Sequence, residues 1–138
     1  MNPIELEATL PIPQALDILT VHLKKEGFGI LTTINLSATL QEKLGVEIAD
    51  TLILGACNPN FAYEALGIDE NVSLVLPCNI VLKTVGDKTK ISIGNPFDLI
   101  NQPGLRDVAS KAYDSLKRVV EAIQNELTAT KANGHKPL

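Results

Sequence analysis

The chain has 138 residues, of which 45% are apolar and 20% charged, and its formal net charge is −4. That length fits one globular domain able to bury about two thirds of its unfolded surface, and the composition is unlike that of a disordered chain. The acidic balance argues against a nucleic-acid-binding protein, because phosphate affinity comes from clustered Lys and Arg, and no segment reaches the roughly 18 apolar residues of a membrane span.

The N-terminal part of the sequence alternates predicted strands and helices. Residues 4–8 alternate apolar and polar side chains, as a half-buried strand does, and leucines at helical spacing predict a helix over residues 14–26. A second strand is predicted over residues 28–34. Ser37 is a suitable N-cap for a short helix that ends at Gly45.

The central part contains two apolar runs that each end in Cys-Asn. The first is predicted as a strand over residues 51–57, and Asn58-Pro59 after it supplies a helix cap and a proline suited to the first helical turn. The second belongs to a strand predicted over residues 72–85, with a kink at Pro77 because proline cannot donate to a central ladder.

The C-terminal part begins with a turn and a fifth predicted strand over residues 90–93. A short helical turn is predicted over residues 95–101. The longest helix then covers residues 103–127, with one apolar stripe over about six turns. The predicted domain is therefore residues 1–127, and the small, polar segment 128–138 is predicted to be a flexible tail.

These elements predict an α+β fold rather than a doubly wound parallel sheet. We expect two layers, in which a mostly antiparallel sheet of about five strands packs against the N-terminal helix and the long C-terminal helix. Ile53 and Val75 would lie on the opposite face of the sheet, which also needs a cover. Dimerisation is one way to provide it.

Cys57 and Cys78 are the only cysteines, and each stands where an apolar run is interrupted. The N-terminal sequence lacks a signal-peptide pattern, which indicates the cytosol and reduced thiols. Cys57 precedes a predicted helix N-terminus, where free amides and the helix dipole would stabilise a thiolate and lower its pKa. The alternative is that Cys57 is a small apolar residue at a strand end.

Cys78 shares a strand face with Ile80 and Leu82, the pattern of a core thiol. If its strand is a neighbour of the strand that ends at Cys57, the two sulfurs could meet as a redox pair or a soft-metal site. No Cys-x-x-Cys spacing supports that reading.

Two asparagines complete the candidate site. Asn58 is most simply a helix cap, whereas the Asn79 amide lies in an apolar strand and needs partners, in a bulged backbone or in a ligand. The candidate ligand-binding residues are therefore Cys57, Asn58, Cys78 and Asn79.

No catalytic, phosphate-binding or metal-binding constellation follows from the other residues. His22 lies on the first helix and His135 in the tail, so a four-ligand zinc site with the two cysteines is not expected. Glu5 and Glu7 have the pattern of solvated positions. Which cofactor the protein uses, if it uses one, is unknown, and whether the protein is an enzyme stays open.

Several segments, in order along the chain, resemble the domain-of-unknown-function family 302, from about Ile4 to Ile123. The resemblance implies a two-layer α+β domain similar to the TATA-binding-protein-like arrangement and suggests a homodimer, but it implies no activity. It rests on Glu26-Gly27-Phe28-Gly29, Thr39-Leu40-Gln41-Glu42-Lys43-Leu44-Gly45, Leu54-Gly55-Ala56-Cys57-Asn58-Pro59 and Leu76-Pro77-Cys78-Asn79.

Two functional hypotheses follow. The first is a cytosolic domain, homodimeric, that binds a small ligand or a partner beside Cys57-Asn58 and Cys78-Asn79. The second is a thiol-based redox protein or a soft-metal binder that uses Cys57 and Cys78.

Overall fold

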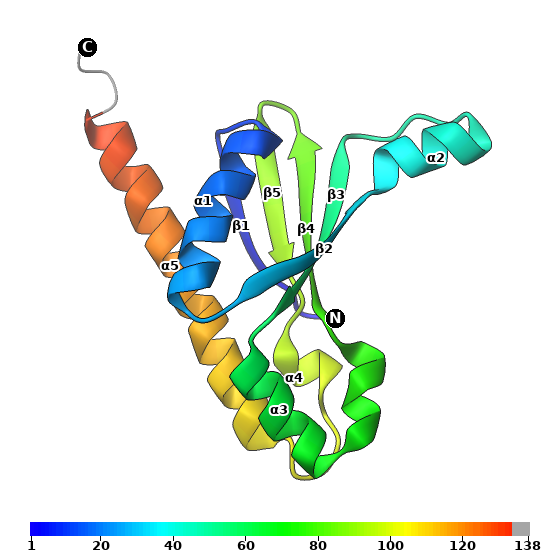
Figure 1. Ribbon diagram of the computed structural model, residues 1–138. Coiled ribbons are helices and arrows are strands. Elements are labelled where there is room, and N and C mark those ends of the chain that lie inside the picture. The colour runs from blue at the N-terminus through cyan, green and yellow to red at the C-terminus, as the bar shows by residue number, and fades with distance from the viewer. Residues whose placement is uncertain (134–138) are drawn as a thin grey trace.

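A five-stranded sheet with the strand order β1-β5-β4-β3-β2 forms one layer of the computed structural model, which describes residues 1–133 (Figure 1). Every neighbouring pair of strands is antiparallel. The predicted five-stranded antiparallel sheet is thus confirmed. The strands are β1 Ile4–Ala8, β2 Gly29–Asn35, β3 Thr51–Cys57, β4 Cys78–Val85 and β5 Lys88–Ile93.

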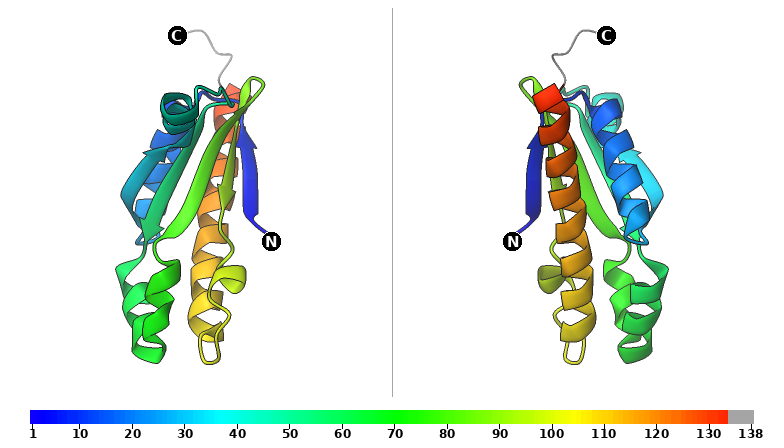
Figure 2. Two further views of the ribbon diagram at one scale, coloured as in Figure 1. Left: turned by 90° about the vertical axis from the view of Figure 1, so that its right-hand side faces the viewer. Right: turned by 90° about the vertical axis from the view of Figure 1, so that its left-hand side faces the viewer.

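The second layer consists of α1, Ile12–Lys25, and the long helix α5, Arg106–Asn133, which cover one face of the sheet (Figure 2). This is the predicted α+β architecture. The shorter helices are α2 Leu36–Leu44, α3 Pro59–Ile68, the 3₁₀ helix η1 Glu70–Val75 and α4 Pro96–Leu99.

The main core lies between these two layers. Strand pairing aligns Leu6, Ile91, Leu82 and Leu52 in one row across the sheet. The helices add fully buried leucines, among them Leu116 of α5. Because side chains alternate between the faces of a strand, the apolar–polar alternation of β1 is sufficient to place its apolar half here.

The opposite face of the sheet is not covered by α1 or α5 (Figure 2). One row across it contains Glu5, Ser92, Val81, Ile53 and Ile34, so that it changes from polar at β1 to apolar at β2. The uncovered face expected from the sequence is therefore present in a single chain.

A second, smaller core lies beyond one end of the sheet, where α3, η1, α4 and the start of α5 meet (Figure 1). Its buried residues are Ala65, Val72, Leu105 and Val108. This region positions the candidate site, since β3 ends and β4 begins beside it.

The prediction of a strand from residue 72 was wrong over residues 72–77. Residues 70–75 form η1, whose N-cap Asp69 accepts a hydrogen bond from the backbone N–H of Asn71 at 2.9 Å. Val72 is buried in the second core whereas Leu74 is 83% exposed, so this apolar run lacks the two-sided burial of a central strand. Val75, expected on the open face of the sheet, belongs to η1 instead.

Two helix ends also differ from the predictions. Asn35, not Ser37, caps α2, because its Oδ1 atom accepts a hydrogen bond from the backbone N–H of Ala38 at 2.9 Å. The predicted tail begins at residue 128, but α5 continues to Asn133. Residues 134–138, with His135, lie outside the described residues. No helix within residues 1–133 combines the length and the apolar character of a membrane span.

Candidate functional site

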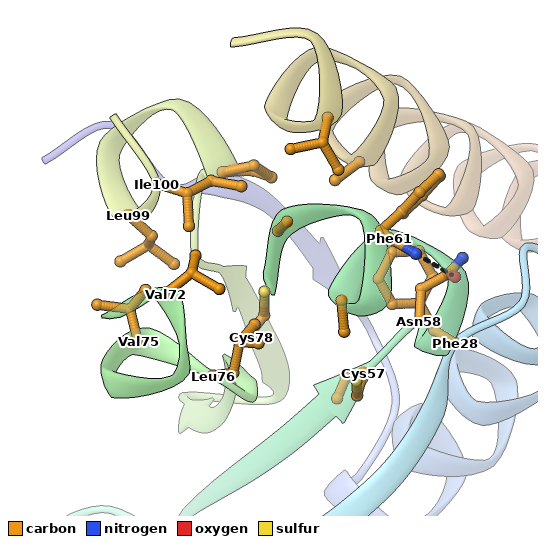
Figure 3. A pocket seen from close by; sticks show the side chains of 16 residues that line it. Phe28, Cys57, Asn58, Phe61, Val72, Val75, Leu76, Cys78, Leu99 and Ile100 are labelled. Atoms are coloured by element: carbon orange, nitrogen blue, oxygen red, sulfur yellow. Dashed lines mark hydrogen bonds between the residues drawn. The ribbon is translucent and has the colours of Figure 1, made fainter. Parts of the chain in front are cut away.

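An apolar cavity of about 40 Å³ lies between the end of the sheet and the second core. Figure 3 shows the side chains around it, which come from β3, β4, α3, η1, α4 and α5. Its walls include Cys57, Asn58 and Cys78 of the candidate set. They also include Phe61, Val72 and Ala112, which the sequence did not single out.

The two thiols reach this cavity from neighbouring strands. Cys78 is the first residue of β4 and pairs with Ala56 of β3, and Cys57 follows Ala56 directly. In Figure 3 the sulfur of Cys78 points into the cavity. Alternation along β3 directs Ala56 and Cys57 to opposite faces, so Cys57 contributes to the wall only where the strand ends. Both thiols are free.

Burial raises the pKa of both thiols. Loss of water around the sulfur is the cause at Cys57, and at Cys78 the nearby Cys57 charge adds to a larger effect of burial. The lowered pKa expected for Cys57 is therefore wrong. The helix amides that would have stabilised a thiolate are occupied, because Asn58 Oδ1 accepts from the backbone N–H groups of Asn60 at 3.0 Å and Phe61 at 3.3 Å.

Asn58 is the N-cap of α3, as predicted. Its Nδ2 atom also donates to the backbone oxygen of Glu26 at 3.1 Å, which ties the end of α1 to the start of α3. Gly27 in that turn has φ +84°, and a Cβ there would lie 3.0 Å from Asn58 Nδ2. Both polar atoms of the Asn58 side-chain amide are thus hydrogen-bonded to the protein backbone.

Asn79 lies away from the cavity. Its side chain is exposed on the open face of the sheet, and its backbone oxygen accepts from the N–H of Gly94 at 3.0 Å. The structure therefore brings Cys57, Asn58 and Cys78 together and separates Asn79 from them. The reason is the period of two: consecutive strand residues such as Cys78 and Asn79 face opposite sides.

Small residues on two helices make room for the cavity. Ala62 and Ala65 on α3 and Ala112 on α5 all line it. Spacings of three or four residues put such side chains on one helix face, so the pair on α3 was a readable sequence signal. The sequence could not show that Ala112 lines the same cavity as Cys78, because this depends on the packing of α5 against α3.

The described residues contain no group of three or more His, Cys, Asp and Glu that could hold a metal ion. His22 is buried, and its Nε2 atom lies 2.8 Å from Oε1 of Glu126, so it links α1 to α5. His22 does not line the cavity, and its contact with Glu126 gives it a structural role between the two helices.

The family model described as "Domain of unknown function DUF302" matches residues 4–123, nearly the whole described chain. The chain belongs to the DUF302 family. A crystal structure of an uncharacterized conserved protein DUF302 from Bacillus stearothermophilus is similar to this DUF302 chain, with a TM-score of 0.77 and 28% identity. The match covers 90% of this chain and 97% of that chain. A comparison with the curated proteins finds no match.

Proposed function

We propose that this DUF302 chain is a cytosolic, homodimeric binding protein whose internal cavity takes up an apolar group of a small ligand beside Cys57 and Cys78. The observation that carries the proposal is the composition of the wall. Apart from two thiols held neutral by burial, its polar side chain is Asn58, which is already hydrogen-bonded. An apolar cavity excludes water and accepts apolar guests. Two free thiols are also compatible with a reducing compartment.

The size of the cavity restricts what enters it. About 40 Å³ exceeds the roughly 10–15 Å³ that one water needs, but is well below the roughly 300–1,000 Å³ of a pocket for a whole drug-sized ligand. Only a small apolar part of a ligand fits without rearrangement.

Thiol chemistry is the less favoured alternative. A redox or nucleophilic cysteine needs a lowered pKa, and a soft metal needs deprotonated thiols. Burial acts against both, because it raises the pKa of Cys57 and of Cys78. At neutral pH both side chains therefore remain thiols, and the cavity is more suited to binding than to reaction.

Xenon tests the apolar cavity directly. We expect xenon pressure to shift the backbone amide resonances of Val72, Cys78 and Ala112 in two-dimensional NMR spectra, and to slow the alkylation of Cys78 by iodoacetamide. The Ala62→Leu variant should abolish both effects, because the added side chain fills the cavity. Tyr63→Leu is the matched control on the same helix, since Tyr63 is 84% exposed. Unchanged resonances in the wild-type protein would contradict the proposal.

The homodimer is supported by exposed apolar side chains on α2 and on the adjoining edge strand β2. None of the nine residues of α2, all within the described chain, is buried, and α2 extends away from the two layers (Figure 1). Leu44 is 69% exposed, and Leu31 and Ile34 of the adjoining strand β2 are 65% and 50% exposed. So short a helix is marginal in water without packing, and a second copy would supply that packing.

We expect the protein to sediment as a dimer at equilibrium and Leu44→Glu to sediment as a monomer, because a charge would replace an apolar contact between the copies. Gln41→Glu is the matched control: it adds the same charge at an exposed polar position of α2 and should remain dimeric. A wild-type monomer at all concentrations, or a dimeric Leu44→Glu, would exclude this interface.

A further inference from the structure

A second hollow lies on the open face of the sheet, outside the internal cavity. It is a groove of about 630 Å³, within the roughly 300–1,000 Å³ range of small-molecule sites. Its polar side chains are Glu5, Asn79 and Ser92, and Val81 adds apolar surface between them. Asn79, separated from the thiols by the structure, is thus part of a hollow of its own.

The groove and the internal cavity share a wall. Val75, Leu76 and Leu99 line both of them, and all three side chains are half-buried. Figure 3 shows these residues together on one side of the cavity, opposite Phe61 and Asn58. Aliphatic side chains therefore separate the groove from the space beside Cys78.

The backbone behind this wall is weakly held. Val75 ends the 3₁₀ helix η1, a type of helix with poorer hydrogen-bond geometry than an α-helix. The hydrogen bond from the Leu76 N–H to the oxygen of Ser73 is long, at 3.4 Å. Leu74, the residue before Val75, is 83% exposed and adds little packing. The part of the wall formed by Val75 and Leu76 can consequently move at a smaller cost than a core strand.

The polar groups of the groove restrict the chemistry of its ligand. The Asn79 side-chain amide, a donor and an acceptor, has no hydrogen-bond partner among the described residues. Ser92 Oγ donates to Glu5 Oε2 at 2.7 Å, and Lys90 Nζ lies 3.3 Å from the same oxygen. The Ser92 hydrogen bond lowers the pKa of Glu5, so that Glu5 lines the groove as a carboxylate paired with Lys90 at neutral pH. Because Lys90 balances the Glu5 charge, an uncharged hydrogen-bonding group is the best match for the Asn79 amide.

We propose that the ligand is a small amphiphile: its uncharged hydrogen-bonding head binds Asn79 in the groove, and its short apolar tail displaces Val75 and Leu76 to reach Cys78. The inference rests on the proposed function, since it assumes that the cavity accepts an apolar group. This inference explains how a ligand larger than the cavity could bind, since only its tail enters the cavity.

Three six-carbon probes test the head group: 1-hexanol, n-hexylamine and hexanoate. We expect 1-hexanol to shift the amide resonances of both Asn79 and Cys78 and to slow the alkylation of Cys78. The charged heads of n-hexylamine and hexanoate lose hydration without gaining an ionic partner, so both should bind at least about tenfold more weakly. Asn79→Ala should weaken 1-hexanol binding about threefold to tenfold, the effect of one hydrogen bond. Asn125→Ala, at an exposed position of α5, is the control and should bind normally.

A second variant keeps the shape of the side chain and changes its charge. Asn79→Asp should strengthen the binding of n-hexylamine and weaken that of hexanoate further. If xenon enters the cavity but the probes bind alike regardless of head group, or Asn79→Ala has no effect, the amphiphile inference is overturned and the apolar cavity stands. If xenon also fails to bind, the proposed function fails with it.

Discussion

Leu116→Ala is expected to lower the free energy of unfolding by about 2–5 kcal/mol, as large-to-small changes in a packed core do. Leu116 is 1% exposed and lies on α5 in the main core, with Leu19 of α1 and Ile80 of β4 in the same cluster. The variant loses the transfer energy of the removed carbons and leaves a void where the two layers meet. Its effect therefore tests whether α5 packs on the sheet.

Urea unfolding followed by far-UV circular dichroism measures this loss as a lower midpoint with an unchanged slope. Protein concentration is held fixed, because a dimer would make stability depend on it. Leu66→Ala is the matched control: Leu66 is 39% exposed on α3, and the change should cost about 1 kcal/mol or less. Equal midpoints for wild type and Leu116→Ala would show that the core is not packed as described.

The two layers of this fold could be predicted because the residue patterns that identify their strands and helices are local in the sequence. Alternation within residues 4–8 and the apolar stripe over residues 103–127 each identify the buried side of an element without any knowledge of its neighbours. The caps at Asn58 and Gly45 are local in the same sense, since each satisfies backbone groups a few residues away.

The 3₁₀ helix η1 could not be predicted in this way. Residues 72–76 are largely apolar, and a short apolar run does not reveal whether it forms a strand or another buried segment. Packing in the second core determines that this run is a helix and not a strand, because it buries Val72 and leaves Leu74 in solvent. The contacts that decide it come partly from Leu105 and Val108, which lie far away in the sequence at the start of α5.

Only part of the candidate site could be predicted from the sequence, for a similar reason. The sequence suggested that Cys57 and Cys78 could meet, and the pairing of β3 with β4 puts both at one cavity. The pKa of Cys57 depends on how deeply its sulfur is buried and on which group takes the helix amides, and neither is visible in the local sequence. The separation of Asn79 from Cys78, in contrast, follows from strand alternation alone.

Gly55→Ala is expected to lower the free energy of unfolding by about 1–3 kcal/mol, the usual cost of overpacking. Gly55 lies in β3 on the open face, beside the segment that leads into β4. A Cβ atom at this position would lie 2.7 Å from Cγ of Pro77 and would collide with Oγ1 of Thr32. The Pro77 ring is rigid and the Thr32 side chain is short, so neither can give way without a shift of its backbone.

Gly29→Ala in the neighbouring strand β2 is the matched control for Gly55→Ala. A Cβ at Gly29 would have no atom of the described residues within 4 Å, so this change should leave the urea midpoint unchanged or raise it slightly. The double variant Gly55→Ala/Thr32→Ala should recover part of the loss, because it removes one of the two colliding atoms. If Gly55→Ala instead matches the wild-type midpoint, Pro77 and Thr32 do not pack over β3 as described.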